Sequence, residues 1–346
     1  MNQPLGAIPA PLRRRRLLAA AALGMLGPAL AFPGRGAAAS EGPLFFGVLP
    51  LGGPLQSRMD WQSVMDGLGH ICQRPMVAVS VTSYDSMEQA IRGGRVDIAF
   101  LSGRLALEAT TEYDMTVMAQ VTRHDGLPGY RSVLLVRANG PIRDLEDVLG
   151  QPNRWRIARG ERQSVSGYVV PQLELFLPRH IKLESHFTQE QIDTHEANYL
   201  ALANGEVDVC TGNTADIERF STHFPVEFSR LRIIWQSELI PHGVIMIRRS
   251  LAASMLEPGR TFLAGYGKGD TPEAGSQRAV LQRLHNLAGF LPADNRSLLP
   301  IVQIEYHLAR ESALNGQWVS EQARQARLQR IEEQRQARLG ILNHPL

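Results

Sequence analysis

The sequence predicts an α/β protein of two lobes, joined by two hinge crossings and followed by a helical C-terminal tail. Segments with strand and helix patterns alternate along the chain, as in sheets covered by helices on both faces. A self-contained alternating block lies between two segments typical of crossing strands, residues 130–137 and 231–237. The length of 346 residues fits two domains of about 150 residues each.

The first lobe is expected to begin with three strands. Apolar runs at residues 44–51, 76–82 and 96–101 predict buried strands. Helices are expected over residues 56–73 and 84–92 and from Ser102 onward, and Gly93-Gly94 is a stop signal for the second of them. This alternation favours parallel strand pairing.

The second lobe is expected between the two crossings, with residues 243–248 returning to the first. Its patterns predict a helix near Leu145, a strand at 155–159, a helix from Ser166, a helix at 195–204 and a strand at 207–211. We therefore assign residues 40–136 and 237–316 to lobe 1 and residues 137–236 to lobe 2. Ligands of such sheets bind at the carboxyl ends of strands, here facing the cleft between lobes.

The chain turns helical after Arg249, and residues 317–346 form the predicted tail. Thr271 and Pro272 are an N-cap and a first helical residue. Residues 319–339 are rich in Gln, Arg and Glu and carry only a weak apolar stripe. A solvated helix and a helix that forms a homodimer are the two interpretations.

The N-terminus has the pattern of an export signal. Four arginines at 13–16 precede an apolar run of 16 residues, and Ala37-Ala38-Ala39 fits a cleavage site. A spanning helix needs roughly 20 apolar residues, so residues 1–39 are interpreted as a signal peptide, with a cut after Ala31 as the alternative. The Sec and twin-arginine routes stay open. We expect a soluble periplasmic protein.

Composition excludes several function classes. Five of the 36 basic residues precede Ser40, so 31 remain against 34 acidic residues, a net charge of −3. This argues against a nucleic-acid binder. Two cysteines, Cys72 and Cys210, are too few for a disulfide framework and are expected to be buried free thiols. With no nucleotide, metal or nucleophile motif, neither a cofactor, a metal nor enzymatic activity is expected.

One short motif has the features of an anion-binding helix start. Ser164-Val165-Ser166-Gly167-Tyr168 follows a predicted strand and opens a helix. Backbone N–H groups at a helix start bind anions, serine hydroxyls add donors, and Gly167 would allow a ligand close to the backbone. An ordinary N-cap is the alternative. Arg159 and Arg162 would add positive potential.

Several long blocks, in order, carry a family resemblance. Together they resemble the periplasmic substrate-binding proteins of phosphonate, phosphite and phosphate ABC transporters, over the mature chain from Leu44 to about Arg310. The blocks are YDSMEQAIRGGRVDIAF (84–100), GYRSVLLVRANGPIRDLEDVLG (129–150), SVSGYVVP (164–171), HEANYLALANGEVDVCTGNT (195–214), IIWQSELIP (233–241) and AGFLPADN (288–295). The resemblance implies a type II, Venus-flytrap fold whose lobes close on an oxyanion and deliver it to a membrane permease.

The resemblance also implies binding residues. The family's Ser-Thr-Ser-Gly cradle falls on Ser164, Val165, Ser166 and Gly167, so Val165 replaces the middle hydroxyl. The family's binding histidine falls on His195, and its two binding tyrosines fall on Tyr84 and Tyr130.

Two departures bear on the ligand. Family members that bind aminoalkylphosphonates hold the ammonium with two acids, at the positions of Ala215, which follows Asn213-Thr214, and of Gly243. A buried ammonium without a partner charge is costly, so we expect a smaller oxyanion, or one with a neutral tail near Asn213, Ala215, His242 and Gly243. Asp216 is expected to point elsewhere on its helix.

The sequence therefore predicts a periplasmic solute-binding protein for a phosphorus oxyanion. A sensor subunit that docks on a membrane signalling receptor is the alternative with the same fold. The sequence does not identify the anion, because Val165, Ala215 and Gly243 break the family pattern.

Overall fold

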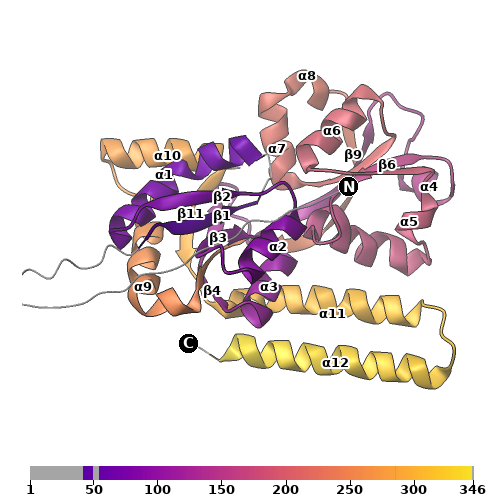
Figure 1. Cartoon of the computed structure of the whole chain (residues 1–346). Helices are drawn as coiled ribbons and strands as arrows, with labels where there is room; N and C mark the ends of the chain where they lie inside the picture. The colour runs from indigo at the N-terminus through magenta and orange to yellow at the C-terminus, as the bar shows by residue number, and fades with distance from the viewer. Residues whose placement is uncertain (1–41, 50–53, 285, 345–346) are drawn as a thin grey trace, which may run out of the picture. The chain divides into compact units, whose positions relative to one another are not determined.

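The computed structural model describes residues 42–49, 54–284 and 286–344, which form two mixed sheets flanked by helices (Figure 1). The predicted signal peptide lies outside the described residues. Within these ranges, no helix is both long and apolar enough to cross a membrane.

The first sheet has the strand order β11-β4-β10-β3-β1-β2. The three strands predicted at the start of the lobe pair in parallel, and the other three are antiparallel to their neighbours. The strands are β1 (Leu44–Val48), β2 (Met76–Ser80), β3 (Ile98–Leu101), β4 (Met115–Arg123), β10 (Val244–Arg248) and β11 (Leu287–Pro292).

Helices cover both faces of the first sheet. Phe46 on β1 packs on one face with residues of α1, α9 and α10, and Ala99 on β3 packs on the other with α2, α3 and α11. These helices are α1 (Pro54–Cys72), α2 (Tyr84–Arg92), α3 (Gly103–Glu112), α9 (Arg249–Gly265), α10 (Pro272–Arg283) and α11 (Leu299–Leu314), with the short η4 (Asn295–Leu298) before α11.

The second sheet has the order β7-β6-β8-β5-β9, with β5 antiparallel to both of its neighbours. Two buried clusters lie on its two faces. Its strands are β5 (Gly129–Arg137), β6 (Arg156–Arg159), β7 (Gln189–Ile192), β8 (Val209–Asn213) and β9 (Leu231–Pro241). Its helices are α4 (Leu145–Leu149), η1 (Val165–Val169), η2 (Gln172–Phe176), η3 (Leu177–Arg179), α5 (Leu183–His186), α6 (His195–Asn204), α7 (Thr214–His223) and α8 (Pro225–Phe228).

The expectation of parallel sheets is therefore wrong in part. β10 and β11 run antiparallel to their neighbours in the first sheet, and β5 runs antiparallel to β8 and β9 in the second. Both crossing segments, β5 and β9, belong to the second sheet over their full length. Sheet membership thus changes before Gly129 and after Pro241, outside the predicted lobe boundaries at 136 and 237, which stay a prediction.

Local signals located the helices well. Ser83 and Ser86 form a reciprocal capping box that starts α2 at Tyr84, and Thr271 caps α10 by accepting from the Ala274 N–H. α6 ends at Gly205, whose φ of 79° is in the left-handed region. The predicted thiols are both free, but Cys72 is only partly buried while Cys210 is buried. Burial raises the pKa of the Cys210 thiol.

The predicted tail helix is α12 (Glu321–Asn343), and it lies antiparallel along α11 (Figure 1). Ile331 and Leu342 are buried, and Leu339 packs on the core shared by α2, α3 and α11. The weak apolar stripe of α12 thus packs against the core of its own chain. Val319, which the sequence placed in the stripe, precedes the helix and is 99% exposed. The homodimer stays a prediction.

We expect Ile331→Ala to loosen α12 from α11. A buried isoleucine truncated to alanine costs about 2–5 kcal/mol, and a peripheral helix responds by local opening before global unfolding. Amide hydrogen exchange should accelerate in α12 and stay unchanged in β1 and β6. Val319→Ala, at an exposed site, is the control, and equal protection of α12 in both variants would contradict this account.

Candidate functional site

A pocket lies between the two sheets, with walls from both lobes. Its volume of about 80 Å³ is several times the roughly 10–15 Å³ that holds one water molecule, so it fits a small ligand. It is lined by Trp61, Tyr84, Phe100, Ser102, Val121, Arg123, Tyr130, Ser164, Val165, Ser166, His195, Asn213, Ala215, Asp216, His242, Gly243, Leu284 and Leu287.

The pocket brings together nearly every residue that the sequence singled out. Tyr84, Tyr130, His195 and the first three cradle residues line it, as do the four residues expected near a ligand tail. Gly167 does not. The lining residues that sequence reasoning missed are Trp61, Phe100, Ser102, Val121, Arg123, Leu284 and Leu287, and Asp216 was expected to point away.

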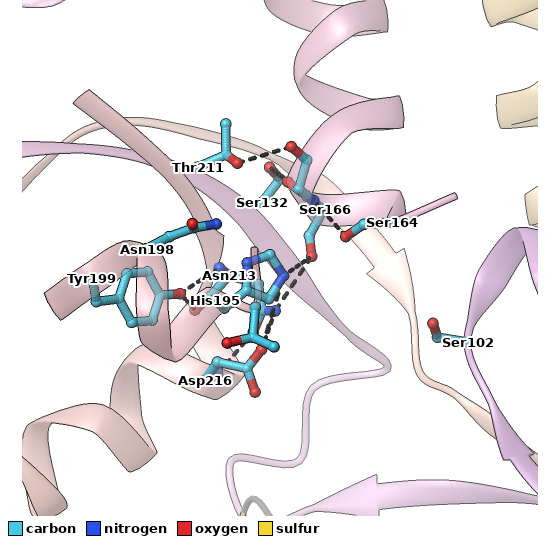
Figure 2. Close-up of polar contacts among 12 residues, drawn as sticks. Ser102, Ser132, Ser164, Ser166, His195, Asn198, Tyr199, Thr211, Asn213 and Asp216 are labelled. Atoms are coloured by element: carbon cyan, nitrogen blue, oxygen red, sulfur yellow. Dashed lines mark hydrogen bonds and ion pairs between the residues drawn. The ribbon is translucent and has the colours of Figure 1, made fainter. Parts of the chain in front are cut away.

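The start of η1 is anchored to the sheet beneath it. Ser132 on β5 donates its hydroxyl to the Ser166 carbonyl at 2.6 Å, and Thr211 on β8 donates to the Gly167 carbonyl at 2.8 Å (Figure 2). Ser164 is the N-cap, and its hydroxyl accepts from the Gly167 N–H at 3.0 Å. The first N–H groups of a helix lack acceptors within it, so the anchored turn presents donors at the pocket wall.

Gly167 has a different role from the one expected. Its N–H is used by the Ser164 cap, and a methyl group on its Cα would lie 2.7 Å from the Cα of Gly160. The absent side chain therefore allows the end of β6 and the start of η1 to approach closely. It makes no room for a ligand.

A polar network joins the start of η1 to α6 and α7 (Figure 2). The Ser166 hydroxyl lies 3.1 Å from His195 Nε2 and accepts from the Asn213 amide at 3.3 Å. Buried Tyr199 fixes Asn213, because its hydroxyl accepts from the Asn213 N–H at 2.9 Å. These contacts hold Ser166 and His195 side by side at the pocket wall.

Asp216 belongs to this network, so the expectation that it points away is wrong. Asn213 caps α7 by accepting from the Asp216 N–H at 2.8 Å, and its amide donates to Asp216 Oδ2 at 2.7 Å. The same oxygen lies 3.9 Å from His195 Nε2. Asp216 is the third residue of α7 after its cap, and this reciprocal contact turns its carboxylate back toward the pocket.

The two tyrosines are neutral donors. Burial, with the charges of Asp216 and Glu161 adding to it, raises the pKa of Tyr84 to about 12. Burial also raises the pKa of Tyr130. The hydroxyl of Tyr84 lies 3.4 Å from Ser102 Oγ, and the ring of Tyr130 stacks on His242. Both therefore keep their O–H protons at neutral pH.

One wall of the pocket is apolar. Trp61 and Phe100 stack with ring centroids 4.9 Å apart, and Leu284 and Leu287 also line the pocket. A methyl group at Gly243 would lie 2.7 Å from the Phe100 ring, so a carboxylate there would displace that ring. Burial lowers the pKa of His242, which favours its neutral form.

The arginines differ from expectation. Arg159 is buried, paired with Glu190 at 2.9 Å and stacked on Tyr168, and Arg162 is paired with Glu184 on the surface. Neither lines the pocket. Arg123 on β4 does so, and it pairs with Glu218 on α7. Among the residues described, no group of three metal-ligating side chains is found.

The fold and this pocket define a two-lobed solute receptor, and comparisons identify its class. Residues 46–298 match the family of periplasmic substrate-binding proteins of phosphonate ABC transporters. The chain is 31% identical over 294 residues, 85% of each chain, to the phosphonates-binding periplasmic protein of Escherichia coli K12.

Solved structures agree. The binding component of an ABC phosphonate transporter from Pseudomonas aeruginosa has a TM-score of 0.79 at 28% identity, covering 87% of this chain and 98% of that one. PhnD1 from Prochlorococcus marinus, solved with methylphosphonate, has a TM-score of 0.66 at 18% identity, covering 77% and 97%, which supports the fold alone.

This chain therefore belongs to the phosphonate-binding family of periplasmic ABC transporter components. The predicted resemblance and the two-lobed type II fold are confirmed. The family consists of substrate-binding transport proteins and not of enzymes.

We expect Gly167→Ala to destabilise the protein by about 1–3 kcal/mol, because the added methyl meets backbone at Gly160. Gly275→Ala is the matched control. Gly275 lies inside α10, where the nearest atom to a new methyl is the end of Arg278 at 3.9 Å, so this change should stabilise by about 0.5–1 kcal/mol. Urea denaturation measures both, and equal effects would contradict the close-approach role.

Proposed function

We propose that this protein is exported, loses residues 1–39 and captures a phosphorus oxyanion in the periplasm for an ABC permease. The head of the anion binds at the start of η1, against the Ser164–Gly167 turn and the Ser166 hydroxyl. His195, Tyr84 and Tyr130 donate from the other sides. The observation that carries this proposal is the convergence of these donors from α2, β5, η1 and α6 on one pocket.

The donor set suits an oxyanion. Hydrogen bonds to a charged acceptor are shorter and roughly twice as strong as neutral ones, and two buried tyrosines whose pKa values are raised stay donors. The loss of the middle hydroxyl at Val165 leaves its backbone N–H in place. Val165 instead packs with Tyr130 and Ile304 in a small apolar cluster.

The apolar wall indicates what kind of substituent the ligand carries on phosphorus. Trp61, Phe100 and Leu287 carry no negative charge to pair with an ammonium, and Ala215 and Gly243 supply no carboxylate. The carboxylate that the pocket does contain, that of Asp216, lies at the head, 3.9 Å from His195 Nε2. A short neutral group on phosphorus buries apolar surface there at no electrostatic cost. A simple alkylphosphonate, phosphite or phosphate therefore fits better than an aminoalkylphosphonate.

Direct contacts between the lobes support capture by closure. Glu161 of the second lobe accepts from the Tyr84 N–H at 3.2 Å, and Gln163 donates to Glu88 at 2.7 Å. Arg219 on α7 lies 3.8 Å from Asp60 on α1. These contacts form only when the lobes meet, so ligand binding and closure are linked in free energy.

Calorimetric titration of the mature protein, refolded to remove carried-over ligand, tests the ligand class. The panel is phosphate, phosphite, methylphosphonate and 2-aminoethylphosphonate, with sulfate as control. We expect micromolar or tighter binding of one phosphorus oxyanion and weak binding of 2-aminoethylphosphonate. No binding across the panel would contradict the proposed function.

We expect Ser166→Ala to weaken binding of that anion without unfolding the protein. A hydrogen bond to a charged group is worth about 1.5–3 kcal/mol, which is roughly 10- to 100-fold in Kd. Ser185→Ala, on the surface of α5, is the control for loss of a serine hydroxyl. Unchanged affinity in Ser166→Ala would refute the site assignment.

Closure makes a separate prediction, because neither Asp60 nor Arg219 lines the pocket. We expect Arg219→Ala to lower ligand affinity a few-fold, on the order of 1 kcal/mol for a partly buried ion pair. A double-mutant cycle with Asp60→Ala should show that the two losses are not additive. Additive losses, or no loss, would mean that this pair does not stabilise the closed form.

A further inference from the structure

Asp216 places a carboxylate in a pocket built from donors, and the proposed function does not explain it. Its Oδ2 lies 3.9 Å from His195 Nε2, and Asn213 bridges it to Ser166 through contacts of 2.7 and 3.3 Å. The carboxylate is thus next to the head-binding groups (Figure 2), and the apolar wall of Trp61 and Phe100 comes from the other lobe.

We propose that Asp216 makes the pocket select oxyanions that keep a proton on the head, such as the monoanion of an alkylphosphonate. This inference rests on the proposed function. The P–O–H group of the ligand donates to the carboxylate, while the other oxygens accept from Ser166, His195 and the tyrosines. A head group with no proton sets an oxygen lone pair against the carboxylate, and a second negative charge is repelled.

The titratable and charged groups around Asp216 determine how this selection depends on pH. His195 and Tyr199 face it from α6, Tyr84 from α2 and Tyr130 from β5, while Arg123 of β4 shares the pocket and pairs with Glu218. The negative charge of Asp216 acts on all three tyrosines and raises their pKa values further beyond the effect of burial. The tyrosines are therefore neutral, and the carboxylate of Asp216 lies beside His195 at the head.

A structural role for Asp216 exists as well, since it completes the cap of α7 with Asn213. An acid in the first turn of a helix contributes only a fraction of a kilocalorie to helix stability, and this contribution does not depend on the ligand. The test therefore needs a measurement that capping does not change.

Methylphosphonate and methanesulfonate supply that measurement. The methylphosphonate monoanion and methanesulfonate have the same charge and similar shape, but only the phosphonate carries a proton. We expect the wild-type protein to bind methylphosphonate at least 100-fold more tightly at pH 6. Above the second pKa of methylphosphonate, its affinity should fall about tenfold per pH unit, and binding should take up one proton from the buffer. Methanesulfonate, which has no proton to lose, reports any titration of His195.

Asp216→Asn replaces an acceptor by a group that also donates. We expect the preference for methylphosphonate over methanesulfonate to narrow at least tenfold, and the pH slope and proton uptake to diminish. Asp193→Asn is the matched control. Asp193 lies two residues before His195 and bonds the Thr194 N–H, outside the pocket lining, so its loss should leave preference and slope unchanged.

Four results would overturn the inference. Equal wild-type affinity for the two anions would do so while leaving the proposed function intact. An Asp216→Asn variant with the wild-type preference, or one that loses only 2-aminoethylphosphonate, would assign the carboxylate to capping or to an ammonium. No measurable binding of any phosphorus oxyanion by the wild-type protein would overturn both proposals. If Asp216→Asn does not fold, the wild-type preference, pH slope and proton uptake still decide.

Discussion

The attachment of the η1 start to the second sheet is the constraint on which the rest of the site depends. Hydroxyls of Ser132 and Thr211 hold the carbonyls of Ser166 and Gly167, and Gly167 packs closely against Gly160. The turn is thereby held at the pocket wall, which Ser164, Val165 and Ser166 line. A binding turn fixed in this way pays its ordering cost on folding and not on ligand capture.

Charge is distributed so that the pocket is selective without being strongly cationic. Arg123 is opposed by Glu218, His195 lies near Asp216, and the remaining donors are neutral hydroxyls and backbone groups. A pocket with this balance gains little from the charge of an anion alone. It must rely on hydrogen-bond geometry, which is the property that separates oxyanions of similar size.

Most of the fold could be predicted, because its signals are local. Apolar runs, caps and glycine stops gave α2 and α6 their observed bounds. The missed strands are β4, β7 and β11. β7 carries Gln, Glu and Ile with no apolar alternation, and β11 contains a glycine and ends in a proline, two residues that are depleted in strands. Their pairing comes from neighbouring strands, which is information that a single segment does not contain. Family resemblance brought the pocket residues together, whereas Trp61 and Leu287 needed the three-dimensional packing.

The error at Asp216 shows where residue-by-residue transfer fails. Counting along a helix puts Asp216 about 100° from Ala215, so if position 215 faces the ligand, position 216 is expected to turn away. That argument assumes that each side chain points straight outward from the helix axis. In the first turn of α7 the Asn213 cap folds back and draws the carboxylate with it, so a pocket that has lost an acid at position 215 still contains one. The acid has moved toward Ser166 and His195, and a carboxylate there meets the oxygens of the head before it meets the substituent. An acid at position 215 would contact the substituent of the ligand. In the proposed binding mode the acid at position 216 contacts the head instead.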